Sequence, residues 1–205
     1  MKNQNDPTHA VIGIKDYDMI QRILGSALKI GGATTDASTS GIPIPPPAPK
    51  FVLGSRSLER LSHVHPQLAK CVKLAITLTT CDFTVLQGLR TYAEQVAAVK
   101  AGNSRTMHSM HLPQADGLAH AVDLGAWLNG QVDWTPRFYA DIAFAMDLAA
   151  TDLKIAEHIR WGGAWDRRLS DFGGNSNAYI EETQAYAKRH AGSDLIDMPH
   201  FEWVA

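Results

Sequence analysis

The chain is poor in cysteine, has no excess of charge of one sign and contains no long hydrophobic run. Its two cysteines, Cys71 and Cys81, lie ten residues apart without a CxxC pair, which argues against a zinc ribbon and a disulfide scaffold. We therefore expect two reduced, buried thiols. Because 19 Lys and Arg stand against 21 Asp and Glu, the chain lacks the basic field that holds a polyanion, and we expect no nucleic-acid partner.

No run of about eighteen apolar residues occurs, and the first residues lack the apolar region of a classical signal peptide. We therefore expect neither an export signal nor a membrane span. Of the 205 residues, 45% are hydrophobic and 20% are charged, a composition that allows a soluble domain to bury its own core.

A proline-rich stretch, GIPIPPPAPK, divides the chain. It follows small polar residues, and together they predict an extended linker over 32–54. In the N-terminal segment, 1–31, apolar residues recur at helical spacing and predict a short amphipathic helix over about 17–29. Its mixed charges favour docking on protein over membrane contact. The main domain is expected at 55–205.

Hydrophobic periodicity in the main domain predicts helices and short strands. A helix is expected over 66–79, and Thr91 with Glu94 forms a capping box for a second helix that ends at Gly102. Two more are expected, one after Pro136 and one in NAYIEETQAYAKRH. The expected strands are 82–88, 121–128, 158–163 and 199–204. This pattern predicts an α+β fold with a small antiparallel sheet flanked by helices.

Histidines and aspartates gather in residues 109–124, SMHLPQADGLAHAVDL. Side chains alternate along a strand, so Val122 and Leu124 in the core would turn Asp123 to the opposite face. His120 would then lie off that face. The sequence therefore favours Asp123 over His120 as a functional side chain.

A catalytic zinc ion takes three protein ligands and leaves a fourth position for water, and a His-Asp-His set is suitable. The histidines that could complete a set with Asp123 are His108 or His111 and, near the C-terminus, His200. The HExxH and deaminase motifs are absent. Spacing alone leaves a zinc site and ordinary structural histidines equally open.

Six stretches in a fixed order resemble motifs of the peptidase M15 family: GLRTYAEQ, GNSRT, SMH, HAVDL, WGGAW and DMPHFEW. Over 55–205 the likeness is greatest to the L-alanyl-D-glutamate endopeptidases that bacteriophages use as endolysins. The resemblance implies a hedgehog/DD-peptidase-like fold and zinc-dependent hydrolysis of peptidoglycan stem peptides.

The resemblance also implies roles for individual residues. His111, Asp123 and His200 would hold the zinc ion, and Asp197, three residues before His200, would be the general base. Glu202 is an alternative base, since it shares a face with His200 on an extended strand.

Other residues would meet the substrate. Arg90 would hold and polarise the scissile carbonyl, and Ser109 and Trp161 would contribute to substrate binding. Trp127, Trp161 and Trp165 together could line a groove or equally pack in the core.

Two departures from the family pattern concern loops. His111 and Asp123 lie twelve residues apart where the family usually has about seven, and Ala119 stands in place of a glycine. The extra residues in LPQADGLA predict a longer loop at the mouth of the site, which costs little free energy. The stretch between Trp165 and Asp197 is also long and could form a wall or lid.

Other functions stay open at this point: a D-alanyl-D-alanine carboxypeptidase, a zinc-bearing but inactive wall-binding module, and a metal-free hydrolase built on Ser109, for which no GxSxG motif is present. Arg167 and Arg168 could bind a substrate carboxylate in either peptidase. An endolysin would accumulate in the host bacterial cytoplasm as a monomer and act on the cell wall once another protein opens the membrane.

Overall fold

The computed structural model describes residues 50–190 and 196–205, which belong to one compact unit, Pro49–Ala205. The helix expected over 17–29 and most of the expected linker lie outside these residues, so both stay predictions. Within the described ranges, no helix is both long and apolar enough to cross a membrane.

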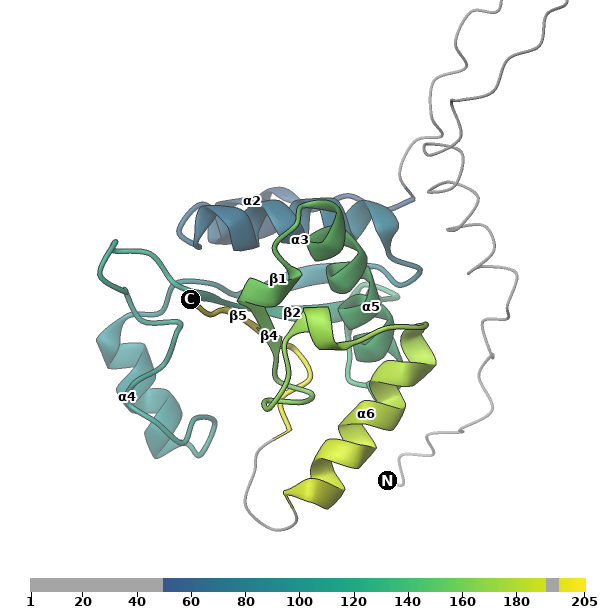
Figure 1. The fold of residues 1–205 in the computed structure, drawn as a ribbon. Helices are drawn as coiled ribbons and strands as arrows, with labels where there is room; N and C mark the ends of the chain where they lie inside the picture. The colour runs from purple at the N-terminus through teal and green to yellow at the C-terminus, as the bar shows by residue number, and fades with distance from the viewer. Residues whose placement is uncertain (1–49, 191–195) are drawn as a thin grey trace, which may run out of the picture. The chain divides into compact units, whose positions relative to one another are not determined.

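An antiparallel sheet forms the centre of the fold (Figure 1). Its strands are β1 (Phe83–Gln87), β2 (Ala121–Leu128), β3 (Gln131–Asp133), β4 (Ile159–Trp161) and β5 (His200–Trp203). The order is β1-β2-β5-β4, and β3 pairs with the end of β2. The α+β prediction with a small antiparallel sheet is confirmed. Strand β3 was not expected, but the Asn129–Gly130 turn that leads into it has positive φ at both residues, as a tight hairpin turn requires.

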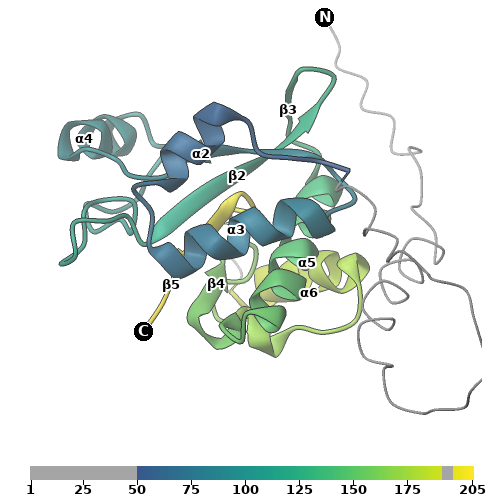
Figure 2. The same ribbon diagram turned by 90° about the horizontal axis from the view of Figure 1, so that it is seen from above.

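The helices of the described residues are α2 (Ser55–Leu61), α3 (Pro66–Leu78), α4 (Tyr92–Lys100), α5 (Pro136–Asp152) and α6 (Ser176–Arg189). Helix α3 packs against α5, and α6 packs on α5 (Figure 2). Val122 and Leu124 of β2 are completely buried in the core that α3 and α5 share with the sheet. The expected capping box of Thr91 and Glu94 is present at the start of α4.

Helix α2, which the sequence did not predict, covers the outer edge of β1. Ser57 Oγ accepts a hydrogen bond from Val85 N–H at 3.1 Å, and the Arg60 guanidinium donates to the Val85 carbonyl at 2.5 Å. These side chains satisfy backbone groups that an edge strand leaves open. A side chain at Gly88 would lie 2.7 Å from the Arg60 carbonyl, so glycine permits the close approach of the two segments.

The two cysteine thiols are free and buried, as expected. Burial raises the pKa of both thiols, that of Cys81 to about 12. At neutral pH these groups are protonated and chemically inert.

Candidate metal centre

His111, Asp123 and His200 lie together on the face of the sheet opposite the core. The buried neighbours of Asp123 turn its carboxylate to this face, as alternation along β2 predicts. His200 pairs directly with Asp123 across β2 and β5. His111 comes from the loop before β2.

The three side chains converge on a small volume. Asp123 Oδ1 lies 3.0 Å from His200 Nδ1 and 3.2 Å from His111 Nε2, and the two imidazole nitrogens are 3.2 Å apart. Zinc–ligand bonds of about 2.0–2.1 Å in a tetrahedron separate neighbouring ligand atoms by roughly 3.3 Å. The donor set and its spacing therefore fit a zinc ion, and the group can bind a metal.

The ring of His111 is oriented by the backbone of Gly88. Its Nδ1 lies 2.8 Å from the Gly88 carbonyl oxygen, which can only accept, so Nδ1 carries the proton. The lone pair of Nε2 then faces Asp123 and His200. A backbone carbonyl often holds a metal-binding histidine in this way.

The ring of His200 is oriented by a carboxylate. Its Nε2 lies 3.3 Å from Glu202 Oε2, and Glu202 in turn accepts a hydrogen bond from Arg160 Nε at 2.7 Å. Glu202 thus lies behind the ring, on the side away from Asp123, and its other oxygen is held by Arg160. In this position Glu202 is better suited to orienting His200 than to acting as the general base.

Electrostatics also couple the cluster. Burial opposes the charge of Asp123, but the adjacent His111 and His200 hold the pKa of this carboxyl well below its usual range. Burial lowers the pKa of His200, but the hydrogen bonds to Asp123 and Glu202 outweigh it and raise this pKa to about 9. Without a metal, the cluster therefore retains a proton at neutral pH.

Asp197 stands at the entry to β5. Its N–H donates to the Gly162 carbonyl at 2.9 Å, and its own carbonyl accepts from His200 N–H at 3.0 Å. A side chain at Gly162 would lie 2.3 Å from the Asp197 carbonyl, so this position requires glycine. Burial and the Asp123 carboxylate raise the pKa of Asp197, while His200 and Arg90 partly offset the rise. The Asp197 carboxyl is thus close enough to interact electrostatically with the metal-ligand side chains and with Arg90.

Arg90 is held beside the cluster by two contacts. Its N–H donates to the His111 carbonyl at 2.8 Å, and its guanidinium donates to Gln95 Oε1 at 2.8 Å. The Gln95 side chain is completely buried and also donates to Thr106 O at 2.7 Å. Sequence reasoning gave Gln95 no role. Its place in the GLRTYAEQ motif could have indicated a role, and the structure shows it as the one buried residue of α4.

The remaining polar candidates have other partners. Ser109 Oγ accepts a hydrogen bond from His111 N–H at 3.2 Å, which orients the loop before the cluster. His120 lies 3.0 Å from Asp116, away from the cluster, and His108 is exposed and outside it. Among the two candidate histidines of this segment, the structure brings His111 to Asp123.

The tryptophans divide between core and surface. Trp161 is 0% exposed, and its Nε1 donates to Met198 O at 2.7 Å. Trp161 therefore packs in the core and offers no surface to a substrate. Its hydrogen bond to Met198 anchors the segment between Asp197 and His200. Trp165 lies beside the His200 ring, with centroids 5.1 Å apart, while Trp127 is 40% exposed.

The long loop between the first two ligands folds on itself. Gln114 N–H donates to Leu118 O at 2.9 Å, and Asp116 Oδ1 accepts from Leu118 N–H at 3.0 Å. Ala119 is buried, and its N–H donates to His63 O at 2.9 Å. The extra residues therefore form a compact turn, and the ligands still converge.

Comparisons with known proteins agree with this arrangement. The family model described as phage L-alanyl-D-glutamate peptidase matches residues 50–204. The L-alanyl-D-glutamate peptidase of Escherichia phage T5 is 30% identical over 118 residues, which cover 57% of this chain and 82% of the relative. The crystal structure of the Serratia marcescens L-Ala D-Glu endopeptidase ChiX superposes with a TM-score of 0.54 at 32% identity, covering 76% of this chain and 92% of that one. The chain therefore belongs to the phage L-alanyl-D-glutamate peptidase family.

Proposed function

We propose that the chain is a zinc-dependent peptidoglycan peptidase that hydrolyses the bond between L-alanine and D-glutamate in the stem peptide. The observation that carries this proposal is the convergence of His111, Asp123 and His200, with Asp197 and Arg90 beside them, inside the region that the family model matches.

The zinc ion, held by His111, Asp123 and His200, would polarise the scissile carbonyl and lower the pKa of a water molecule to about 7. Asp197 is the general base that takes the proton of the attacking water and passes it to the leaving amine. No hydrogen bond from residues 50–190 or 196–205 occupies its carboxylate. Its raised pKa brings it closer to the pH at which it must exchange protons.

Arg90 provides positive charge for the oxygen of the scissile carbonyl as negative charge develops there. Gln95 holds its guanidinium and so limits the reorganisation needed during the reaction. Ser109 accepts from His111 N–H and keeps its own hydroxyl proton, which it can donate to a substrate carbonyl.

The alternatives receive less support. An inactive wall-binding module would not need Asp197 and Arg90 beside the metal ligands. A metal-free hydrolase would need Ser109 activated by a histidine side chain, but the hydroxyl contacts the backbone N–H of His111. A D-alanyl-D-alanine carboxypeptidase would share the metal chemistry, but the family match favours the bond between L-alanine and D-glutamate, and product analysis tests this directly.

The biological role that we propose is lysis of the host bacterium. The enzyme would accumulate as a monomer in the host cytoplasm and act on the periplasmic cell wall after another protein opens the membrane. Residues 55–205 would be the catalytic domain, joined by the linker at 32–54 to the segment 1–31.

Digestion of purified sacculi, with identification of the products by mass spectrometry, tests the proposed bond. We expect stem peptides that begin with D-glutamate and glycan that still carries L-alanine. Release of free D-alanine alone would establish the carboxypeptidase activity instead, and intact sacculi in the presence of zinc would contradict both.

A further inference from the structure

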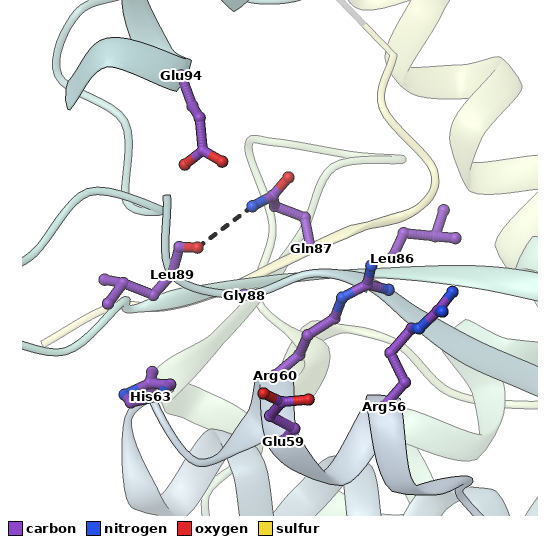
Figure 3. A pocket seen from close by; sticks show the side chains of 9 residues that line it. All are labelled: Arg56, Glu59, Arg60, His63, Leu86, Gln87, Gly88, Leu89 and Glu94. Atoms are coloured by element: carbon purple, nitrogen blue, oxygen red, sulfur yellow. Dashed lines mark hydrogen bonds between the residues drawn. The ribbon is translucent and has the colours of Figure 1, made fainter. Parts of the chain in front are cut away.

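A second polar site lies beside the metal centre. It is a pocket of about 480 Å³, within the range of roughly 300–1,000 Å³ that is typical of ligand sites (Figure 3). Helix α2, the end of β1 and the start of α4 surround it. The lining residues are Arg56, Glu59, Arg60, His63, Leu86, Gln87, Gly88, Leu89 and Glu94.

The pocket and the metal centre are neighbours along β1 and β2. Gln87 in the lining pairs with Asp123 across the two strands, and the Gly88 carbonyl accepts the hydrogen bond that orients His111. The Leu86 side chain covers Gly125, where a Cβ would lie 2.7 Å from it. Gly125 is two residues from Asp123 and therefore on the same face of β2. The pocket therefore begins at residues that directly neighbour Asp123 and His111.

The arginines of the pocket keep free hydrogen-bonding capacity. Arg60 uses one N–H for the Val85 carbonyl, and its side chain reaches up from α2 toward the pocket (Figure 3). Arg56 has no hydrogen-bond or ion-pair partner among the described residues. By contrast, Arg167 pairs with Glu182 at 2.7 Å, and Arg168 donates to the Glu157 carbonyl at 2.9 Å. Arg167 is therefore neutralised by a carboxylate, while Arg168, like Arg60, uses one N–H for a backbone carbonyl but lies outside the pocket lining.

The acidic lining residues differ in the same way. The Glu94 carboxylate accepts hydrogen bonds from Thr91 N–H at 2.7 Å and from its hydroxyl at 2.8 Å, as part of the cap of α4. Glu59 makes no side-chain hydrogen bond within the described residues. Its unneutralised negative charge would therefore repel an anion bound in the pocket.

We propose that this pocket is a substrate subsite in which Arg56 and Arg60 bind a free carboxylate of the stem peptide. The proposal rests on the proposed function, because that function makes the substrate a peptide that contains D-glutamate. One carboxylate of the substrate is the D-glutamate carboxyl outside the peptide chain, and another is the C-terminal carboxylate of the stem. A guanidinium binds either one through paired hydrogen bonds.

Synthetic stem peptides test the subsite and distinguish the two sources. One peptide has both carboxylates free, a second has the D-glutamate carboxyl amidated, and a third has the C-terminus amidated. For the wild-type enzyme, kcat/KM should fall about tenfold or more when the bound carboxylate is amidated, since hydrogen bonds to charged groups contribute strongly. Amidation of the other carboxylate should have little effect and so identifies the ligand.

Variants then assign the effect to the pocket. Arg56→Gln and Arg60→Gln should each bring the ratio of kcat/KM for free and amidated peptide closer to one, and Glu59→Gln should increase it. Arg168→Gln is the matched control and should leave the ratio unchanged. Arg56 is exposed and makes no hydrogen bond or ion pair with the other described residues, so its replacement should leave the fold intact.

A wild-type enzyme that cleaves all three peptides equally well would overturn the subsite and leave the proposed function standing. A preference that persists in both pocket variants, or that disappears in Arg168→Gln, would overturn it as well. If no peptide is cut between L-alanine and D-glutamate, the proposed function fails, and the subsite fails with it.

Discussion

Glu202 lies behind the ring of His200, with 3.3 Å between Oε2 and Nε2. Arg160 holds the same carboxylate, and Glu202 is only 4% exposed. The contact places the His200 proton on Nε2 and leaves Nδ1 to face Asp123. A carboxylate behind a metal-binding histidine orients the ring and increases its basicity.

Glu202→Ala should weaken zinc binding by about 10- to 100-fold, because loss of such an outer partner typically costs that much affinity. Glu202→Gln should retain most of the affinity, since its amide oxygen can still accept from Nε2. Competition with a chromogenic chelator measures both. Glu157→Ala, which removes the partner of the half-buried His158, is the control. Equal zinc affinity in Glu202→Ala and wild type would mean that the pair has no such role.

His111→Ala should abolish stoichiometric zinc binding, because it removes one of three converging ligands. His108→Ala and His120→Ala should bind zinc normally, since these side chains lie outside the cluster. Elemental analysis of the three purified variants makes the comparison. Full zinc content in His111→Ala would show that the metal is held elsewhere.

Gly162→Ala should reduce kcat by about 10²-fold, because its Cβ would lie 2.3 Å from the Asp197 carbonyl and would displace this segment. Gly173→Ala is the control, since a Cβ there meets nothing within 4 Å. Steady-state kinetics of both variants gives the comparison. Equal losses in the two variants, or none in Gly162→Ala, would contradict the role of the close approach.

Zinc binding should release a proton at neutral pH. Hydrogen bonds to Asp123 and Glu202 raise the pKa of His200 to about 9 in the metal-free protein, and zinc must displace that proton. Affinity should therefore fall by about tenfold per unit as pH drops below 9 and level off above it. Calorimetry at pH 7 in buffers of different ionisation enthalpy counts the protons. A binding enthalpy that does not depend on the buffer would contradict the raised pKa.

Local patterns predicted the position of Asp123 and several helices and strands, whereas His111, His200, Asp197 and Arg90 received their roles only from the resemblance to the peptidase M15 family. Strand alternation placed Asp123 opposite the core, and the Thr91–Glu94 capping box marked the start of α4 correctly. These features depend on residues close together in the chain. The fold class followed for the same reason, because each helix and strand has its own hydrophobic period.

Long-range contacts were beyond such patterns. Helix α2 has only seven residues, which is too short for a clear hydrophobic period. Its role, to cover the edge of β1, depends on contacts of Ser57 and Arg60 with Val85, which lies about 25 residues later in the chain. Strand geometry left Glu202 as an alternative base, and it could not show that Arg160, 42 residues away in the chain, holds the same carboxylate. The sequence left Trp161 open between lining a groove and packing in the core, and contacts from distant segments bury it completely.

The variant Asp197→Asn tests most directly whether His111, Asp123 and His200 form a catalytic site together with the Asp197 carboxylate. Asparagine nearly preserves the shape of the side chain but cannot accept a proton, and a general base typically contributes about 10² to 10⁴ in rate. Zinc content and turnover of a stem peptide should be measured on one preparation. We predict one zinc per chain, as in the wild type, with turnover reduced by at least about 10². Near-normal turnover with zinc bound would contradict the account and assign the base to another group.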